Sequence, residues 1–191
     1  MKNCAKISLV VATTTCVALG QGTVLWDESV NGPLSQYSSA PTVLAPLQAG
    51  TNTVIGMTEI VPTGNGWTVH PDFFTFTLPG NLSLGAVFFS VNRSNVWTWI
   101  GDSTFSNPLG FAANSANGDL LPQWGLSSIG PGAYGVDVEN HDAQTLTSVA
   151  NYRLDFLAHT IPEPSTVGLL LLAGACALAT VCLRMSRLGH R

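Results

Sequence analysis

Apolar and polar residues alternate in several short stretches of the chain between residues 21 and 160. Every second residue is apolar in residues 74–78, 82–88, 134–138 and 152–156. A period of two predicts β-strands that each bury one face. Helical periodicity is scarce in this region, and glycine, proline, asparagine and serine separate the apolar runs. We therefore predict an all-β domain over residues 21–160, a single jelly-roll-like β-sandwich.

One segment inside the predicted domain does not follow the alternation. We expect residues 101–130 to form a long loop inserted into the sandwich. Residues 125–130, Gly-Leu-Ser-Ser-Ile-Gly, miss the G-x-S-x-G nucleophile motif by one residue. Because no strand-turn-helix pattern surrounds them, we interpret them as loop as well.

An apolar run near the N-terminus predicts a signal peptide over residues 1–20. Residues 7–19 form a short, mainly apolar run behind Lys2 and Lys6, and the small residues Ala18 and Gly20 suit cleavage near Gly20/Gln21. A helix of this length spans about 20 Å, which is short of a roughly 30 Å hydrocarbon core. The sequence therefore favours a cleaved leader over a membrane anchor.

The second apolar run predicts a transmembrane helix over residues 166–183. Residues 167–183 carry no charged side chain, and Arg184, Arg187 and Arg191 follow them. By the positive-inside rule these arginines hold the C-terminus in the cytoplasm and leave the preceding domain outside.

Charge and cysteine content exclude several classes of function for residues 21–160. Arg93 and Arg153 are the basic residues of this region, which has no lysine and contains all the acidic residues except Glu163. Nucleic acid and anionic lipid are poor partners for such an acidic domain. The four cysteines lie in the two terminal segments, so a disulfide scaffold, a cysteine-ligated zinc and a cysteine nucleophile are not expected here.

The segment before the C-terminal apolar run carries a recognisable motif. Residues 161–166 read Ile-Pro-Glu-Pro-Ser-Thr, and the apolar run and the arginines follow them. Pro162, Glu163 and Pro164 in this position resemble the PEP-CTERM family of sorting signals, over residues 161–191. The resemblance implies a membrane enzyme of the exosortase type, which removes the span and passes the protein to the cell surface or an exopolysaccharide matrix. The alternative is an unprocessed single-span membrane protein.

The predicted domain has a looser resemblance of its own. Residues 26–32, 50–56 and 72–79 are similar to the ectodomains of many PEP-CTERM proteins, and more loosely to the pre-peptidase C-terminal β-sandwich. Residues 152–156 resemble the closing strand of that sandwich. This resemblance implies a secreted accessory module.

A group of oxygen-bearing side chains near the end of one predicted strand is a candidate calcium site. Asp137, Glu139, Asn140 and Asp142 lie close together in sequence, and calcium prefers oxygen ligands. The EF-hand spacing fails, because Asp142 stands where that loop needs glycine and Ser148 where it needs glutamate. We favour the interpretation that the group is a polar strand end running into a turn.

The remaining candidates are aromatic and histidine residues. Trp97 and Trp99 lie two apart and share one face of a strand, where they could stack on sugar rings or pack within the domain. His70, His141 and His159 have no metal-binding spacing, and we expect no cofactor.

These observations favour a non-enzymatic, exported cell-surface or matrix protein in contact with extracellular polysaccharide. The alternative is a secreted hydrolase whose catalytic site is assembled from dispersed residues.

Overall fold

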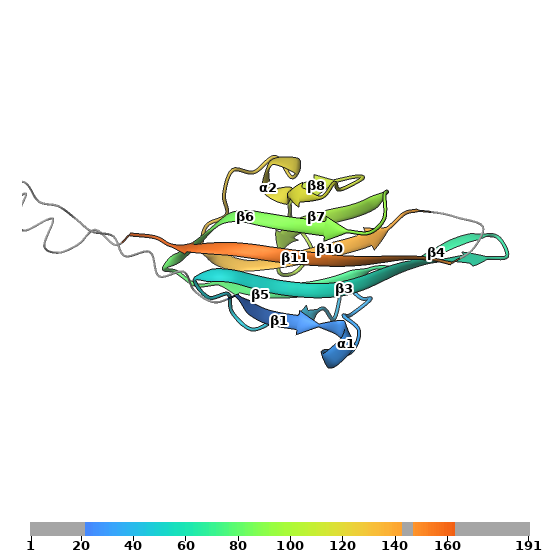
Figure 1. The fold of residues 1–191 in the computed structure, drawn as a ribbon, viewed down its shortest axis with the longest axis horizontal. Helices are drawn as coiled ribbons and strands as arrows, with labels where there is room; N and C mark the ends of the chain where they lie inside the picture. Colours follow the sequence, from blue (N-terminus) through green and yellow to red (C-terminus); the bar gives the residue numbers. More distant parts are fainter. Residues whose placement is uncertain (1–21, 143–146, 163–191) are drawn as a thin grey trace, which may run out of the picture.

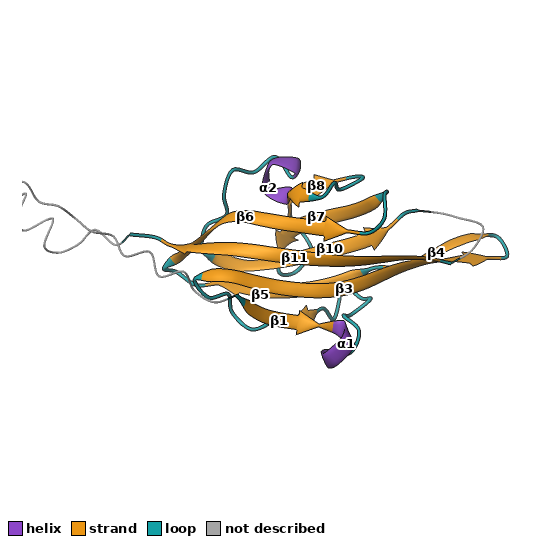
Figure 2. Ribbon diagram, in the orientation of Figure 1, coloured by secondary structure: helices purple, strands orange, loops and turns teal. Residues whose placement is uncertain are grey.

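The computed structural model describes residues 22–142 and 147–162, which form two facing β-sheets (Figures 1 and 2). The predicted all-β sandwich is therefore confirmed. The six-stranded sheet runs in the order β1 (Thr23–Asp27), β3 (Gly50–Thr63), β11 (Ser148–Thr160), β6 (Leu82–Val91) and β9 (Gly118–Asp119), with β4 (Gly66–His70) paired to β3. The five-stranded sheet runs in the order β2 (Thr42–Val43), β5 (Asp72–Leu78), β10 (Gly132–Asn140), β7 (Val96–Asp102) and β8 (Pro108–Ala112). Two single-turn helices accompany the sheets, α1 (Glu28–Asn31) and α2 (Leu120–Gln123).

The chain crosses repeatedly between the two sheets. The series β3-β11-β6-β9 in one sheet faces the series β5-β10-β7-β8 in the other, and all pairs within these two series are antiparallel. The last two strands of the sequence lie inside the sheets, not at their edges. Strand β10 lies between β5 and β7, and β11 lies between β3 and β6. This exchange of strands between two sheets is the connectivity of a jelly roll.

The core lies between the sheets, and it is built by the alternation that the sequence predicts. Side chains buried from β5, β10 and β11 are Phe74, Phe76, Leu78, Val136, Val138, Tyr152, Leu154 and Phe156. The Phe156 ring lies 5.0 Å from that of Phe76 and 6.4 Å from that of Phe74, between centroids, so aromatic contacts join the two sheets.

The predicted alternation is wrong for the second half of β6. Leu82 and Leu84 are buried as expected, but Phe88 is 48% exposed, and Val87 and Phe89 are buried instead. The reason is a β-bulge: Leu157 and Ala158 of β11 pair with Ala86 and Leu84, so the intervening residue of β6 has no partner. One extra residue moves every later side chain to the opposite face.

The expectation of an inserted loop over residues 101–130 is also wrong. This segment contains the end of β7, then β8, β9 and α2. Strand β8 extends one sheet, β9 extends the other, and Leu120, Leu121 and Trp124 are buried at that side of the sandwich. Residues 125–130 contain no strand-turn-helix arrangement, and Ile129 pairs with Leu84.

Several predictions about the ends of the chain lie outside the described residues. These are the signal peptide over residues 1–20 and the membrane helix over residues 166–183. Within residues 22–142 and 147–162, neither helix has the length and apolar character needed to cross a membrane.

Candidate functional site

The outer face of the five-stranded sheet carries aromatic and acidic side chains. Alternation directs every second residue of each strand toward the core, so the residues between them point outward. The outward side chains at the centre of this face are Phe73 on β5, Asp137 and Glu139 on β10, Trp97 and Trp99 on β7, and Phe111 on β8.

Strand register joins these side chains into rows. Asp137 lies opposite Phe73 on one side and opposite Trp99 on the other, and Trp99 lies opposite Phe111. In the next row Glu139 lies opposite Trp97. Side chains that face each other across neighbouring strands are close enough to interact. Four strands therefore contribute to one continuous surface.

The turn between β7 and β8 adds a further aromatic ring. Phe105 stacks on Trp99 with 5.4 Å between ring centroids, and its edge meets the Phe73 ring at 5.3 Å. The Phe105 backbone has φ of 57°, a left-handed conformation that is unfavourable for an aromatic residue. The Asp102 carboxylate holds the turn by accepting hydrogen bonds from the Thr104 hydroxyl at 2.7 Å and the Ser106 amide at 3.0 Å.

Two glycines allow the rings to lie close against the sheet. A Cβ atom at Gly135 would stand 2.7 Å from Cζ of Phe105 and 2.9 Å from the Asp102 carbonyl oxygen. A Cβ atom at Gly101 would overlap the Trp99 indole and stand 2.5 Å from the Asn107 carbonyl oxygen. Neither space is available to a side chain, because the aromatic rings occupy it.

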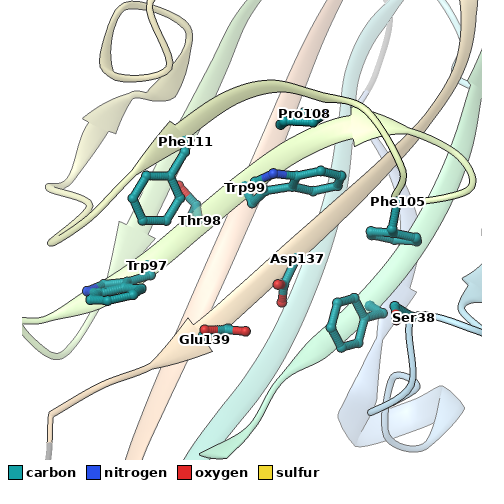
Figure 3. Close-up of a pocket in the computed structure, with 10 residues that line it drawn as sticks. Ser38, Trp97, Thr98, Trp99, Phe105, Pro108, Phe111, Asp137 and Glu139 are labelled. Atoms are coloured by element: carbon teal, nitrogen blue, oxygen red, sulfur yellow. The ribbon is translucent and has the colours of Figure 1, made fainter.

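These residues enclose a cleft of about 470 Å³, which we call the aromatic cleft (Figure 3). Ser38, Thr98 and Pro108 complete its lining. The volume is in the range of small-ligand sites. Apolar rings form its walls and two carboxyl groups lie among them.

The two carboxyl groups of the cleft lie close enough for Glu139 to affect Asp137. The pKa of Asp137 is raised to about 9, first by burial, then by the nearby Glu139 carboxylate and a hydrogen bond with that group, and least by Asp72. Asp137 therefore holds a proton at neutral pH. The Oδ1 atom of Asp137 is buried and has no hydrogen-bond partner within the part of the chain that the structure describes.

His141 connects the carboxyl pair to the aromatic surface. Its Nε2 atom lies 2.6 Å from Oε2 of Glu139, and its ring stacks on Trp97 with 3.8 Å between centroids. Trp97 also meets Phe111 edge-on at 5.6 Å, and its indole N–H donates to Oδ1 of Asn95. Trp97 and Glu139 are thus held in fixed positions at one end of the cleft.

The structure places Trp97 and Trp99 together on the outer face of β7, as their spacing predicts. Each indole has one neighbour stacked on it, His141 on Trp97 and Phe105 on Trp99. Both tryptophans remain half-buried and line the cleft.

The candidate calcium ligands are divided between two sides of the sheet. Asp137 and Glu139 line the cleft, whereas Asn140 is buried on the inner side and donates from Nδ2 to the Ser148 carbonyl at 2.8 Å. The Asp142 amide donates to Oδ1 of Asn140 at 2.9 Å, which is a turn at the end of a strand. Within residues 22–142 and 147–162, no three His, Cys, Asp or Glu side chains are placed to hold a metal ion together.

The histidines singled out from the sequence lie apart. Nδ1 of His70 is 3.0 Å from Oε1 of Gln36, His141 contacts Glu139, and His159 lies beside Gly85. In the described ranges, no histidine ring forms a hydrogen bond with a serine hydroxyl.

The predicted sorting motif is at the edge of the described chain. Pro162 is exposed just beyond β11. Glu163, Pro164, Arg184, Arg187 and Arg191 lie outside the described residues.

Sequence reasoning missed three of the aromatic residues of the cleft. Phe73 directly precedes Phe74, which the alternation places in the core, so the same alternation predicts that Phe73 points outward. Phe111 becomes apparent only through the pairing of β8 with β7. Phe105 belongs to a turn, and no sequence periodicity marks it.

Comparisons with known proteins show a similar solved structure but no family. No protein-family model and no curated protein matches the chain. Among solved structures, the chain is similar to PliG from Salmonella Typhimurium, a periplasmic lysozyme inhibitor of g-type lysozyme, with 10% identity and a TM-score of 0.37. The match covers 61% of this chain and 99% of that one. Neither the fold nor the function of this chain is inferred from a likeness of this size.

Proposed function

We propose that this protein is an exported, non-enzymatic surface or matrix protein whose aromatic cleft binds polysaccharide. The observation that carries the proposal is the row Phe73–Asp137–Trp99–Phe111 across four strands of one exposed sheet face. Flat aromatic rings offer apolar surface to the C–H faces of sugar rings, and carboxyl groups exchange hydrogen bonds with sugar hydroxyls.

The exposure of Phe111 supports a binding role. Phe111 is 50% exposed although it lies beside two tryptophans. A cluster of apolar surface in contact with water marks a binding site more often than a structural one. The polar groups within the cluster would orient a ligand, as in other small-ligand sites.

Export is supported by the two ends of the sequence. The apolar run behind Lys2 and Lys6 favours a cleaved leader. The Pro162-Glu163-Pro164 motif before an apolar span and an arginine tail favours processing by an exosortase-type membrane enzyme. Such a route delivers the domain to the cell surface, where polysaccharide is the abundant ligand.

Binding can be tested with the purified full-length protein in detergent. Its affinity for a panel of soluble polysaccharides and their oligosaccharides would be measured by calorimetry. Because stacking on one ring contributes roughly 0.5–1.5 kcal/mol beyond the buried area, Trp99→Ala should weaken binding by about tenfold. Phe111→Ala should act in the same direction.

Matched controls exist on the other sheet. Trp67 is 42% exposed on β4 and Phe88 is 48% exposed on β6, so Trp67→Ala and Phe88→Ala remove comparable rings away from the cleft. These variants should bind like the wild type. Equal loss of affinity in all four variants, or no binding to any saccharide, would overturn the proposal. Release of reducing sugar ends during incubation would instead support the hydrolase alternative.

A further inference from the structure

The aromatic cleft has an unbalanced charge. Its lining includes Asp137 and Glu139 but no lysine or arginine. Arg153 donates from Nε to Asp155 at 2.8 Å on the six-stranded sheet, and Arg93 donates to the Val149 carbonyl at 3.2 Å. Both arginines of the described ranges are thus engaged outside the cleft.

The groups that surround Asp137 do not neutralise it either. Glu139 lies on the same strand as Asp137, and Asp72 lies on the neighbouring strand β5. Both groups are acidic, and both raise the pKa of Asp137. Strand β7 presents Trp97, Thr98 and Trp99 to the cleft, none of which carries charge. His141 is bonded to Glu139. Burial and these acidic neighbours raise the pKa of Asp137, and its Oδ1 atom is buried without a hydrogen-bond partner in the described part of the chain.

We propose that the aromatic cleft selects saccharides that carry a protonated amine, with the ammonium group at the Asp137–Glu139 pair and the sugar ring against Trp99. This inference rests on the proposed function and specifies its ligand class. An ammonium group brings three donors and a positive charge to two carboxyl groups that have no lysine or arginine partner, although His141 lies 2.6 Å from Glu139. The neighbouring indole rings attract the same cation through their electron-rich faces. A neutral sugar can stack on the aromatic rings but brings no positive charge to the two carboxyl groups.

The decisive experiment compares oligosaccharides of equal length that differ in one group. Oligomers of glucosamine, N-acetylglucosamine and glucose would be titrated into the purified full-length protein at a pH where the amine is protonated. Because charge-assisted hydrogen bonds are roughly twice as strong as neutral ones, the glucosamine oligomer should bind about tenfold more tightly than the other two.

Substitutions separate charge recognition from stacking. Asp137→Asn and Glu139→Gln keep the shape of each side chain, and both should remove the preference for the amine while leaving the affinity for the glucose oligomer nearly unchanged. Trp99→Ala should weaken binding of all three oligomers. Asp155→Asn, which removes an acid on the other sheet, controls for general attraction of a cation to an acidic protein and should preserve the preference.

Proton release provides a second readout. Calorimetry in buffers with different ionisation enthalpies should show that the glucosamine oligomer displaces up to about one proton from the wild-type protein, because a bound ammonium group favours the ionised form of Asp137. Asp137→Asn should abolish this release.

The outcomes distinguish this inference from the proposed function. Equal affinity for all three oligomers, or a preference that Asp137→Asn and Glu139→Gln leave intact, overturns the amine selection while saccharide binding stands. A simple polyamine that binds as tightly as the glucosamine oligomer overturns the assignment to a sugar. Binding of none of the oligomers and none of the wider panel removes both proposals.

Discussion

Gly56 on β3 lies directly opposite Tyr152 on β11, and the tyrosine ring occupies the space that a side chain at residue 56 would need. Both residues point into the core. The Tyr152 hydroxyl crosses to the facing sheet and donates to Oδ2 of Asp72 on β5 at 2.9 Å. A glycine in one strand thus allows a buried hydrogen bond between the two sheets.

Gly56→Ala should destabilise the fold because its Cβ atom would overlap the Tyr152 ring. Overpacking of a well-filled core reduces the free energy of unfolding by about 1–3 kcal/mol. Denaturant unfolding followed by circular dichroism would measure it. Gly80→Ala is the control, since a Cβ atom there has no neighbour within 4 Å. Equal stability of the Gly56→Ala and Gly80→Ala variants would show that the ring does not fill this space.

Asp72 should make the stability of the domain fall as pH rises. The pKa of Asp72 is raised from 3.8 to about 8, mainly by burial and further by the Glu28 carboxylate. Between these two values the folded protein retains a proton that the unfolded chain has released, so the free energy of unfolding falls with increasing pH. The slope for one such group is at most about 1.4 kcal/mol per pH unit. Asp137, with its pKa raised to about 9, acts in the same direction.

We predict that thermal unfolding occurs at a higher temperature at pH 5 than at pH 8, and that Asp72→Asn makes this difference smaller. Asp102→Asn is the control. Hydrogen bonds from Thr104, Asn107 and Ser106 lower the pKa of Asp102 to about 2, so its carboxylate is ionised in both states throughout this range. A pH dependence that Asp72→Asn leaves as steep as in the wild type would show that Asp72 does not retain the proton.

Calcium should have almost no effect on stability. Calcium requires six to eight oxygen ligands. Of the candidate ligands, Asp137 and Glu139 line the cleft, whereas Asn140 is buried on the core side of the sheet. Only ligands that prefer the folded state stabilise it, so millimolar calcium should leave the melting temperature unchanged. A rise of several degrees that Asp137→Asn removes would make this a calcium-dependent domain.

The sequence predicts most of the core of this fold but not its irregular parts. Alternation identifies the buried faces of β5, β10 and β11, because each of these strands is regular over its whole length. It fails at Phe88 because the bulge in β6 inserts one residue without changing the apolar character of the segment. It fails over residues 101–130 because β9 has two residues and α2 has four, too few to show any period.

The candidate site was predictable to a similar extent. Trp97 and Trp99 stand out because they are two residues apart. Their contact with Asp137 depends on the register between β7 and β10, strands that lie far apart in sequence. The position of Phe105 depends on a turn that Asp102 stabilises and on a left-handed backbone, neither of which follows from composition.

Processing at the sorting motif is tested by the mass of the mature protein. A protein anchored by residues 166–183 must keep them, whereas a processed one must lose them. Intact mass spectrometry of the native surface form should find the residues before about Gln21 and after about Thr166 missing. Replacement of Pro162, Glu163 and Pro164 by alanine should leave full-length protein in the membrane fraction. A surface form that retains Arg191 would establish a permanent single-span anchor.

The most direct test of the aromatic cleft is to observe its indole N–H groups during ligand titration. The chain has five tryptophans, each with its own indole signal in a nitrogen–proton correlation spectrum. Two of them, Trp97 and Trp99, line the cleft. Trp26 and Trp67 lie elsewhere, so their signals serve as internal references, whereas the Trp124 indole N–H donates to Oγ1 of the cleft residue Thr98 at 3.0 Å. Addition of a binding saccharide should shift the Trp97 and Trp99 signals in proportion to occupancy and leave those of Trp26 and Trp67 in place. Shifts confined to Trp26 or Trp67 with an unchanged Trp97 and Trp99 would contradict binding at the cleft.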